Sequence, residues 1–246
     1  MPINYLVRLT ARERTVSANL HLGLLLASVA GALNAGGFLA IGQYTSHMTG
    51  IVSSAADNLV LGKFGLTIAA ALSLLAFISG AATTAWVVSY ARRNSPGNIY
   101  AVPLQIEAAL LVAFGIAGAF LQRHELASLS FTVILLCFTM GLQNALITKI
   151  SNAEIRTTHV TGLVTDIGIE IGKFLYWNRS HDVALHTVLA NRARLRVHSA
   201  LVLCFFAGGL LGAVGFNYAG FSFAVFLALP LIGVSLAPSL QSKRRV

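Results

Sequence analysis

Charged side chains are scarce in this chain. Only 10% of its 246 residues are charged, whereas 56% are hydrophobic, and the mean hydropathy is +0.76. Soluble domains of ordinary composition carry about 25% charged residues. The shortage excludes a water-soluble globular protein and predicts an integral membrane protein surrounded by a lipid bilayer. No polar block is long enough to form a separate domain, so residues 1–246 are interpreted as a single membrane domain.

Cysteines and acidic residues are also few. The two cysteines, Cys137 and Cys204, fall within apolar runs and imply packing without a disulfide framework. The sequence contains no phosphate-binding glycine loop, no nucleophile motif and no cysteine-rich metal pattern. We therefore expect no cofactor, no metal and no ATP-driven step. The 17 Lys and Arg are too dispersed to indicate a nucleic-acid partner and are better explained by membrane topology.

Six apolar runs are long enough to cross the roughly 30 Å hydrocarbon core of a bilayer as helices. Two shorter segments, 47–62 and 159–175, are helical in pattern but more polar. The sequence therefore predicts an all-α, polytopic membrane helix bundle. The six predicted transmembrane helices are 19–41, 65–91, 102–121, 127–148, 198–218 and 220–238.

Two short motifs each occur twice, in the same order. The pattern Thr-Ser-His-Met-Thr-Gly at 45–50 recurs as Thr-Thr-His-Val-Thr-Gly at 157–162. Upstream of each copy, the pattern Gly-Ala-Leu-Asn-Ala at 31–35 recurs as Gly-Leu-Gln-Asn-Ala at 141–145. Two matched blocks at nearly the same offset predict an internal duplication.

The distribution of Lys and Arg orients the predicted helices. If the two short segments do not cross and the N-terminus is cytoplasmic, 15 of the 17 basic residues are cytoplasmic, and only Lys63 and Arg123 lie outside. Such an excess is typical of cytoplasmic loops. The C-terminus is then cytoplasmic too. A topology in which both short segments cross places four basic residues outside; it is weaker but stays open.

Three crossings in each half give the two halves opposite orientations. We expect a 3+3 inverted repeat, with repeat 1 at about 19–121 and repeat 2 at about 127–238, in which the two short segments are re-entrant half-helices. Inverted repeats with broken helices near the midplane are the usual architecture of secondary transporters. Irregular backbone at that depth is tolerated where it is buried in protein or lines a wet cavity.

The candidate substrate site combines the two repeated motifs. We expect a Ser or Thr to cap each half-helix, whose N-terminus favours an anion or the negative end of a dipole. The glycines would allow a ligand or another backbone to approach closely. The histidines would lie near a common axis, where they could bind substrate, carry a proton or hydrogen-bond within their own turn. The predicted substrate-binding residues are Asn34, Thr45, Ser46, His47, Thr49, Gly50, Asn144, Thr158, His159, Thr161 and Gly162.

Acidic residues in the half-helices are candidates for ion or proton coupling, because a charge within a membrane is costly. Asp166 is the first candidate and Asp57 the second, with an ion-paired structural carboxylate as the alternative for both. Glu107 lies one turn after Pro103 in the third apolar run, where a buried and an interfacial position are equally expected. Two histidines without further ligands fall short of a metal site.

These motifs resemble those of a bacterial family of unknown function, the YoaK family (domain of unknown function 1275). The resemblance covers roughly residues 20–236 and implies an inner-membrane location. The family pattern usually has Asp where this chain has Asn34, and Asn where it has His47. The motifs that carry the resemblance are Gly31-x-x-Asn34-Ala35, His47-Met48-Thr49-Gly50, Met140-Gly141-Leu142-Gln143-Asn144-Ala145 and Thr157-Thr158-His159-Val160-Thr161-Gly162.

The sequence favours a secondary transporter or permease-like protein, not an enzyme, that binds a small anionic or polar solute or ion between the two half-helices. A channel, a membrane-embedded enzyme using His47, His159 and Asp166, and a structural or regulatory membrane protein remain as alternatives. A homo-oligomer is also open, because a glycine-rich face around Gly208 and Gly212 could pack against a partner.

Overall fold

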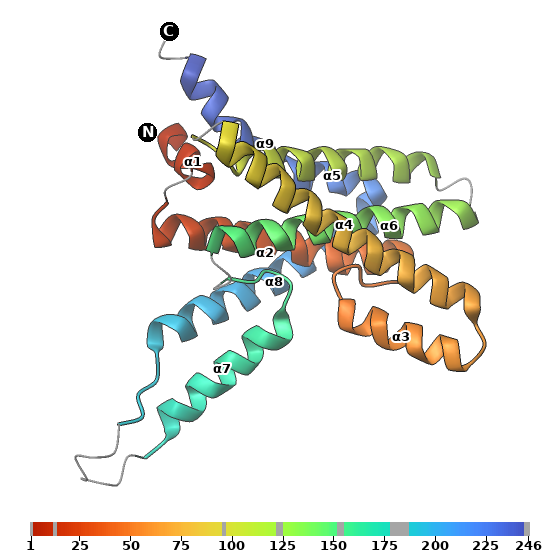
Figure 1. Ribbon diagram of the computed structural model, residues 1–246, viewed down its shortest axis with the longest axis horizontal. Helices are drawn as coiled ribbons and strands as arrows, with labels where there is room; N and C mark the ends of the chain where they lie inside the picture. Colours follow the sequence, from red (N-terminus) through yellow and green to blue (C-terminus); the bar gives the residue numbers. More distant parts are fainter. Residues whose placement is uncertain are drawn as a thin grey trace.

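The computed structural model describes residues 2–11, 14–94, 97–121, 125–151, 155–177 and 187–243, and within these ranges it is helical, without strands (Figure 1). Each of the eight predicted helical segments coincides with a helix, with ends that differ by up to six positions. The helices are α1 (Pro2–Thr10), α2 (Val16–Ile41), α3 (Met48–Val60), α4 (Phe64–Asn94), α5 (Ala101–Leu121), α6 (Glu125–Ser151), α7 (Val160–Leu175), α8 (Arg192–Ala219) and α9 (Phe223–Lys243).

The largest difference from the predicted ends is at the start of α8. An apolar run predicts a beginning at residue 198, but the helix begins at Arg192. The side chain of Asn191 accepts a hydrogen bond from the N–H of Arg194 at 3.0 Å and so caps two additional polar turns. Hydropathy locates the part of a helix that suits lipid, whereas the cap decides where the helix begins.

Four stretches of the described chain are long and apolar enough to cross a membrane. They are Val16–Leu39, Phe64–Asn94, Phe131–Ser151 and Arg192–Gln241, and the last of them contains both α8 and most of α9. A shorter apolar helix, Ala101–Ile116, lies within α5. Length and composition together are those of a helical membrane protein.

Three pairs of long helices form the bundle: α2 packs with α8, α4 with α6, and α5 with α9. In the first pair the two backbones touch. A Cβ atom added to Gly31 of α2 would lie 1.9 Å from the carbonyl oxygen of Phe205, and one added to Gly208 of α8 would lie 2.0 Å from that of Ser28. Small residues let membrane helices approach this closely, and any side chain here would force them apart.

An equivalent contact joins α4 to α6. A Cβ atom added to Gly80 of α4 would lie 2.0 Å from the carbonyl oxygen of Phe138, and one added to Gly141 of α6 would lie 2.0 Å from that of Phe77. The Thr84 hydroxyl also donates a hydrogen bond of 2.9 Å to the carbonyl oxygen of Leu142 across the pair. Both helix pairs therefore depend on glycine where their backbones meet.

The large apolar side chains of the core fill the space enclosed by α2, α5, α6, α8 and α9. The outer side of α4 is different, because its leucines, isoleucines and Trp86 are exposed, as suits contact with lipid. Fully buried core side chains include Leu22, Leu26, Leu33, Leu104, Leu111, Phe114, Leu136, Met140 and Leu146.

The two short helices lie on the same side of the bundle and point in opposite directions (Figure 1). Helix α3 packs on α4, and α7 packs on α8. Their N-terminal ends lie toward the middle of the molecule, while their C-terminal ends point toward its two ends (Figure 1). Each short helix therefore starts near the middle of the molecule and runs outward toward one of its two ends (Figure 1).

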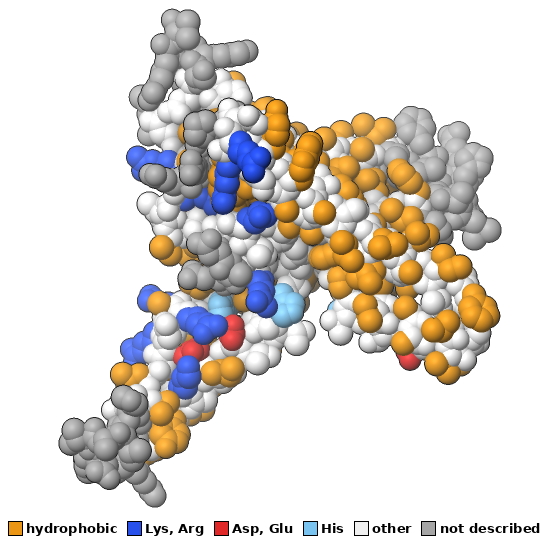
Figure 2. Space-filling view, viewed as in Figure 1, with side chains coloured by type: hydrophobic (Ala, Val, Ile, Leu, Met, Phe, Trp, Pro, Cys, Tyr) orange, Lys and Arg blue, Asp and Glu red, His pale blue; other side chains and the backbone are white. Residues whose placement is uncertain are grey.

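Basic residues gather at one end of the molecule, near both termini and the start of α8, while apolar side chains cover much of the remaining face (Figure 2). The amide of Gln241 in α9 donates to the side-chain oxygen of Asn4 in α1 at 2.9 Å, so the two terminal helices meet at this end. Five basic residues lie outside the described ranges, and they are Arg12, Arg123, Arg179, Arg244 and Arg245.

Candidate functional site

The first repeated motif lies in a bend between α2 and α3. Gly42 ends α2 with a left-handed backbone (φ 71°), and its N–H donates to the carbonyl oxygen of Phe38. The side-chain oxygen of Asn34 then accepts hydrogen bonds from both the N–H (3.3 Å) and the hydroxyl (2.8 Å) of Ser46. Asn34 therefore holds the start of α3 against the preceding helix.

The second motif is held in the same way. The side-chain oxygen of Asn144 in α6 accepts a hydrogen bond of 2.6 Å from the Thr158 hydroxyl, just before α7 begins. The Asn144 amide donates to the carbonyl oxygen of Met140 at 2.9 Å, which fixes the orientation of the side chain. Asn34 and Asn144 occupy equivalent motif positions and make equivalent contacts, so each is an anchor for a half-helix.

The prediction that a Ser or Thr caps each half-helix is wrong. The residues at the N-cap positions of α3 and α7 are His47 and His159, and neither side chain makes a capping hydrogen bond. The hydroxyls of Ser46 and Thr158 are engaged by the anchoring asparagines instead. The N–H groups in the first turn of both half-helices therefore have no side-chain cap and keep their capacity to bind an anion.

Each motif glycine makes room for the neighbouring histidine ring. A Cβ atom added to Gly50 would lie 2.2 Å from Cδ2 of His47, and one added to Gly162 would lie 2.5 Å from Nδ1 of His159. The close approach expected of a ligand is thus made by the histidine ring of the same turn. Nδ1 of His159 also lies 3.2 Å from Nη1 of Arg156. Both histidines are exposed.

The two motifs contain a buried threonine pair that sequence reasoning recognised only in part. Thr45 and Thr157 are both fully buried, and their hydroxyl oxygens have no hydrogen-bond partner among the described residues. Thr45 belongs to the predicted site, whereas Thr157 does not, although the motif alignment makes the two equivalent. Thr49 and Thr161, one turn further along, are exposed on the surfaces of α3 and α7.

The two candidate coupling carboxylates have different surroundings. Asp166 forms an ion pair with Arg194 of α8 at 3.1 Å, and Nδ1 of His198 lies 3.6 Å from the same oxygen. Asp57 is exposed on α3 and forms no ion pair within the described chain. The surroundings of Asp166 match the structural alternative given above, and its coupling role remains a prediction.

Glu170, an acidic residue of the second short segment, strengthens the connection between α7 and α8, a contact that the sequence did not predict. Its side chain is buried and accepts a 2.9 Å hydrogen bond from Nζ of Lys173 and a 2.7 Å hydrogen bond from the backbone N–H of Asn191. These two hydrogen bonds, of which that from Lys173 has the larger effect, hold the pKa of Glu170 below its usual range. An acidic residue three positions before a lysine is only a weak sequence signal for such a contact.

Glu107 is also buried. It is 0% exposed within α5, and one carboxylate oxygen accepts a hydrogen bond of 2.8 Å from the Gln143 amide of α6. Gln143 directly precedes the anchoring residue Asn144. Of the two positions left open for Glu107, the structure therefore selects the buried one.

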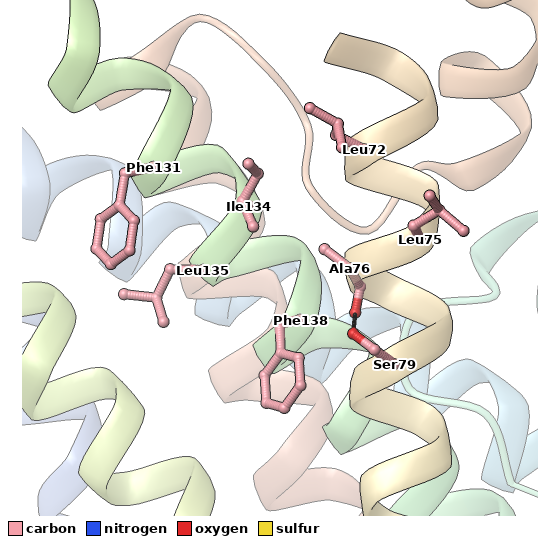
Figure 3. A pocket seen from close by; sticks show the side chains of 8 residues that line it. All are labelled: Leu72, Leu75, Ala76, Ser79, Phe131, Ile134, Leu135 and Phe138. Carbon is pink, nitrogen blue, oxygen red and sulfur yellow. Dashed lines mark hydrogen bonds between the residues drawn. The ribbon is translucent and has the colours of Figure 1, made fainter. Parts of the chain in front are cut away.

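The pocket between α4 and α6 is apolar and does not include either motif (Figure 3). Its one internal hydrogen bond joins Ser79 to the carbonyl oxygen of Ala76 within α4. A second pocket, between α5 and α9, is likewise apolar except for Gln105 and Ser235. By contrast, Figure 2 shows a hollow between the part formed by α3 and the start of α4 and the part formed by α7 and the start of α8.

The described residues do not gather as metal ligands do. Across the described ranges, no group of three or more His, Cys, Asp or Glu side chains could hold a metal ion. The polar groups that the two motifs supply are hydroxyls, imidazoles and the N–H groups at two helix starts. Such donors suit a small anion or polar molecule better than a cation.

Long apolar helices around two short polar ones define the chain as a helical membrane protein. It belongs to the family described as protein of unknown function (DUF1275), whose model matches residues 22–237 and so covers most of the chain. The resemblance inferred from the motifs is therefore confirmed. Searches of curated proteins and of solved structures found no match.

Proposed function

We propose that the protein is a secondary transporter or permease-like protein that binds a small anionic or polar solute between the N-terminal ends of α3 and α7. The proposal is carried by one observation: two short helices, α3 and α7, begin with uncapped first turns, and the residue before each start is held by an asparagine of the preceding long helix. A helix start with free N–H groups attracts negative charge, and two such starts on either side of a hollow suit a solute site.

The proposal includes an inverted duplication, and the glycine contacts support it. Gly31 of α2 corresponds to Gly141 of α6 in the repeated motif. Gly80 and Gly208 lie outside the repeated motifs, but α4 and α8 are the second long helices of the two halves, and each glycine meets the backbone of the first long helix of the other half. Each of the two glycine-mediated pairs, α2 with α8 and α4 with α6, therefore contains one helix from each half. The two halves therefore share a centre, about which we expect one half to move against the other during transport.

We further propose six crossings, with both termini in the cytoplasm of a bacterial cell and the bundle in its inner membrane. Successive long helices, namely α2, α4, α5, α6, α8 and α9, run in alternating directions (Figure 1). The end at which the termini meet carries the gathered Lys and Arg in Figure 2. This arrangement agrees with the excess of basic residues that marks cytoplasmic loops.

The first experiment is a thermal-shift screen of the purified protein against inorganic anions, small carboxylates and nucleobases. A ligand that binds only the folded state raises the unfolding temperature by mass action. We expect Thr49→Val and Thr161→Val to reduce the shift caused by a binding compound, because both exposed threonines lie in the uncapped first turns. Thr83→Val is the matched control, because the Thr83 hydroxyl lies on α4, outside both motifs, and donates to the carbonyl oxygen of Ser79.

Uptake into proteoliposomes then tests transport itself. We expect accumulation of a binding compound that depends on an ion gradient. Flux that follows only the solute's own gradient would indicate a channel, and conversion of the solute in detergent would indicate an enzyme. A thermal shift that survives in both threonine variants would refute the site, while a failure of every compound to bind or move would favour a structural or regulatory role.

A further inference from the structure

Glu107 and Gln143 form a polar contact deep within the core of the bundle. Both side chains are 0% exposed. The Gln143 amide nitrogen donates to one Glu107 oxygen at 2.8 Å and to the carbonyl oxygen of Leu26 in α2 at 3.2 Å. The second Glu107 oxygen, Oε2, and the Gln143 oxygen, Oε1, are both buried without a hydrogen-bond partner in the described chain. The contact therefore has two acceptors and no donor to satisfy them.

Within the described chain, no ion pair balances this carboxylate. Leu26 and Gln143 are the residues of α2 and α6 at the contact. The titratable residues nearest to them along these helices are His21, five positions from Leu26, and Cys137 and Lys149, each six positions from Gln143. His21 is bonded to Tyr5 of α1. An unpaired carboxylate in such surroundings is strongly disfavoured relative to its neutral form.

A single proton satisfies both unpaired oxygens. Protonation of Oε2 converts Glu107 into a neutral acid and supplies the missing O–H donor. The acceptor for this new donor is Oε1 of Gln143, the unpaired oxygen of the amide that already donates to Glu107. An acid and a primary amide can then form two parallel hydrogen bonds, N–H to carboxyl oxygen and O–H to amide oxygen. The neutral pair leaves neither buried oxygen without a partner, whereas the ionised pair leaves both.

We propose that Glu107 and Gln143 are a proton-binding site, in which Glu107 carries a proton at neutral pH and donates it in a hydrogen bond to Gln143. The reaction is the binding or release of one proton at Oε2, and no other bond changes. This site also suggests that transport is coupled to the movement of protons, an inference that rests on the function proposed above. Gln143 is adjacent to Asn144, so a movement of α6 that alters the anchor of α7 also alters the partner of the acid.

Infrared spectroscopy of the purified full-length protein tests the proton directly. At neutral pH we expect a carboxylic acid C=O band, separate from carboxylate bands, that shifts in D₂O. Glu107→Gln should remove the band. Glu170→Gln is the matched control and should leave it unchanged, because Glu170 is paired with Lys173. Should Glu107→Gln fail to fold, Gln143→Met keeps the acid and should shift its band to higher frequency by removing the hydrogen-bond partner.

Absence of the acid band at neutral pH, or a band that both the Glu107 and the Gln143 variants leave unaltered, would overturn the proton site. Coupling is measured separately, as uptake with and without an inward proton gradient. We expect Glu107→Gln to abolish the acceleration by the gradient while a bound solute still raises the unfolding temperature. An intact acid band in a protein that transports nothing would sink the transport proposal and leave the proton site standing.

Discussion

The half-helices α3 and α7 begin alike but are supported differently. Both start at an uncapped histidine and are anchored by an asparagine. Along its length α3 rests on apolar packing, with Ile51 buried against Ala76 of α4 and Cys137 of α6. Helix α7 is joined to α8 by charged groups, including the Asp166 and Arg194 ion pair and the Glu170 contacts. Similar starts can thus be built on two kinds of support, which respond differently to salt and pH.

This difference assigns separate roles to the two ends of the proposed site. Apolar contacts between α3 and α4 do not depend on ionic strength, so they suit a fixed wall. The partly exposed ion pair between Asp166 of α7 and Arg194 of α8 can break and re-form at small energetic cost, which suits an element that moves. Helix α7 lies at the basic end of the molecule (Figure 1 and Figure 2), so in the topology proposed above the movable half-helix is on the cytoplasmic side.

The largest losses of stability should come from substitutions of the packing glycines, and they should be similar in both halves. Gly80→Val and Gly208→Val each place a side chain where the backbone of the facing helix lies 2.0 Å from the new Cβ. We expect each to destabilise the fold by about 3 kcal/mol or to prevent folding, because overpacking separates the helices. Size-exclusion chromatography and thermal unfolding in detergent measure the loss. Gly168→Ala is the control, because its Cβ would meet no atom within 4 Å.

If only one of the two glycine variants were harmful, the halves would not rest on equivalent scaffolds. The comparison of α3 with α7 would then be a comparison of unrelated elements. Equal harm would instead leave the difference in side-chain support as the main distinction between the two half-helices.

The next effect in size should also be shared. Asn34→Ala and Asn144→Ala remove the hydrogen-bond acceptor that anchors each half-helix. We expect a loss of stability of about 1–2 kcal/mol in each variant, because the partly buried hydroxyl of Ser46 or Thr158 loses its acceptor. Hydrogen–deuterium exchange should rise at the start of α3 in the first variant and at the start of α7 in the second. Asn34→Asp retains an oxygen acceptor and should preserve the anchor; equal exchange in Asn34→Asp and Asn34→Ala would contradict this role.

The sequence predicts the helices well because apolar runs and a repeated motif are local features. It predicts the capping wrongly because the partner of Ser46 is Asn34, twelve positions earlier on another helix. A local cap and a distant anchor compete for the same hydroxyl, and spacing alone does not reveal which one prevails.

The charged residues show the same limit. The pairing of Asp166 with Arg194 joins two separate helices and depends on how α7 lies against α8. The burial of Glu107 depends on which face of α5 turns inward, and a helix that is apolar all round carries no such information. Thr157, in contrast, could have been found by aligning the second motif residue by residue with the first.

Acidic pH should affect the two half-helices differently, with a larger loss of stability in α7 than in α3. The pKa of Glu170 is lowered in the folded protein, chiefly by Lys173, so its contribution to stability is present above the unfolded pKa of about 4.3 and is lost as the pH falls through the lower folded value. We expect exchange in α7 to rise relative to α3 below about pH 4. In Glu170→Gln this acid-induced rise should be smaller. A parallel rise in α3 would indicate general acid unfolding and refute a specific role for Glu170.

The smallest effect should come from the partly exposed pair of Asp166 and Arg194. Asp166→Asn removes the charge while keeping the shape, and a pair of this kind contributes about 0.5–1 kcal/mol at most. Exchange in α7 should therefore rise roughly two- to fivefold at low salt. The gap between variant and wild type should narrow toward about 1 M salt, where the screening length falls to about 3 Å.

Asp57→Asn on α3 is the matched change, and it should alter exchange in neither half-helix because Asp57 has no ion-pair partner in the described chain. Arg194→Gln should reproduce the effect of Asp166→Asn, and the double variant should add little to either single one, because all three lose the same pair. If salt instead increased exchange in α3 as much as in α7, the distinction between a fixed apolar wall and a movable charged one would fail, even with every anchor and glycine contact intact.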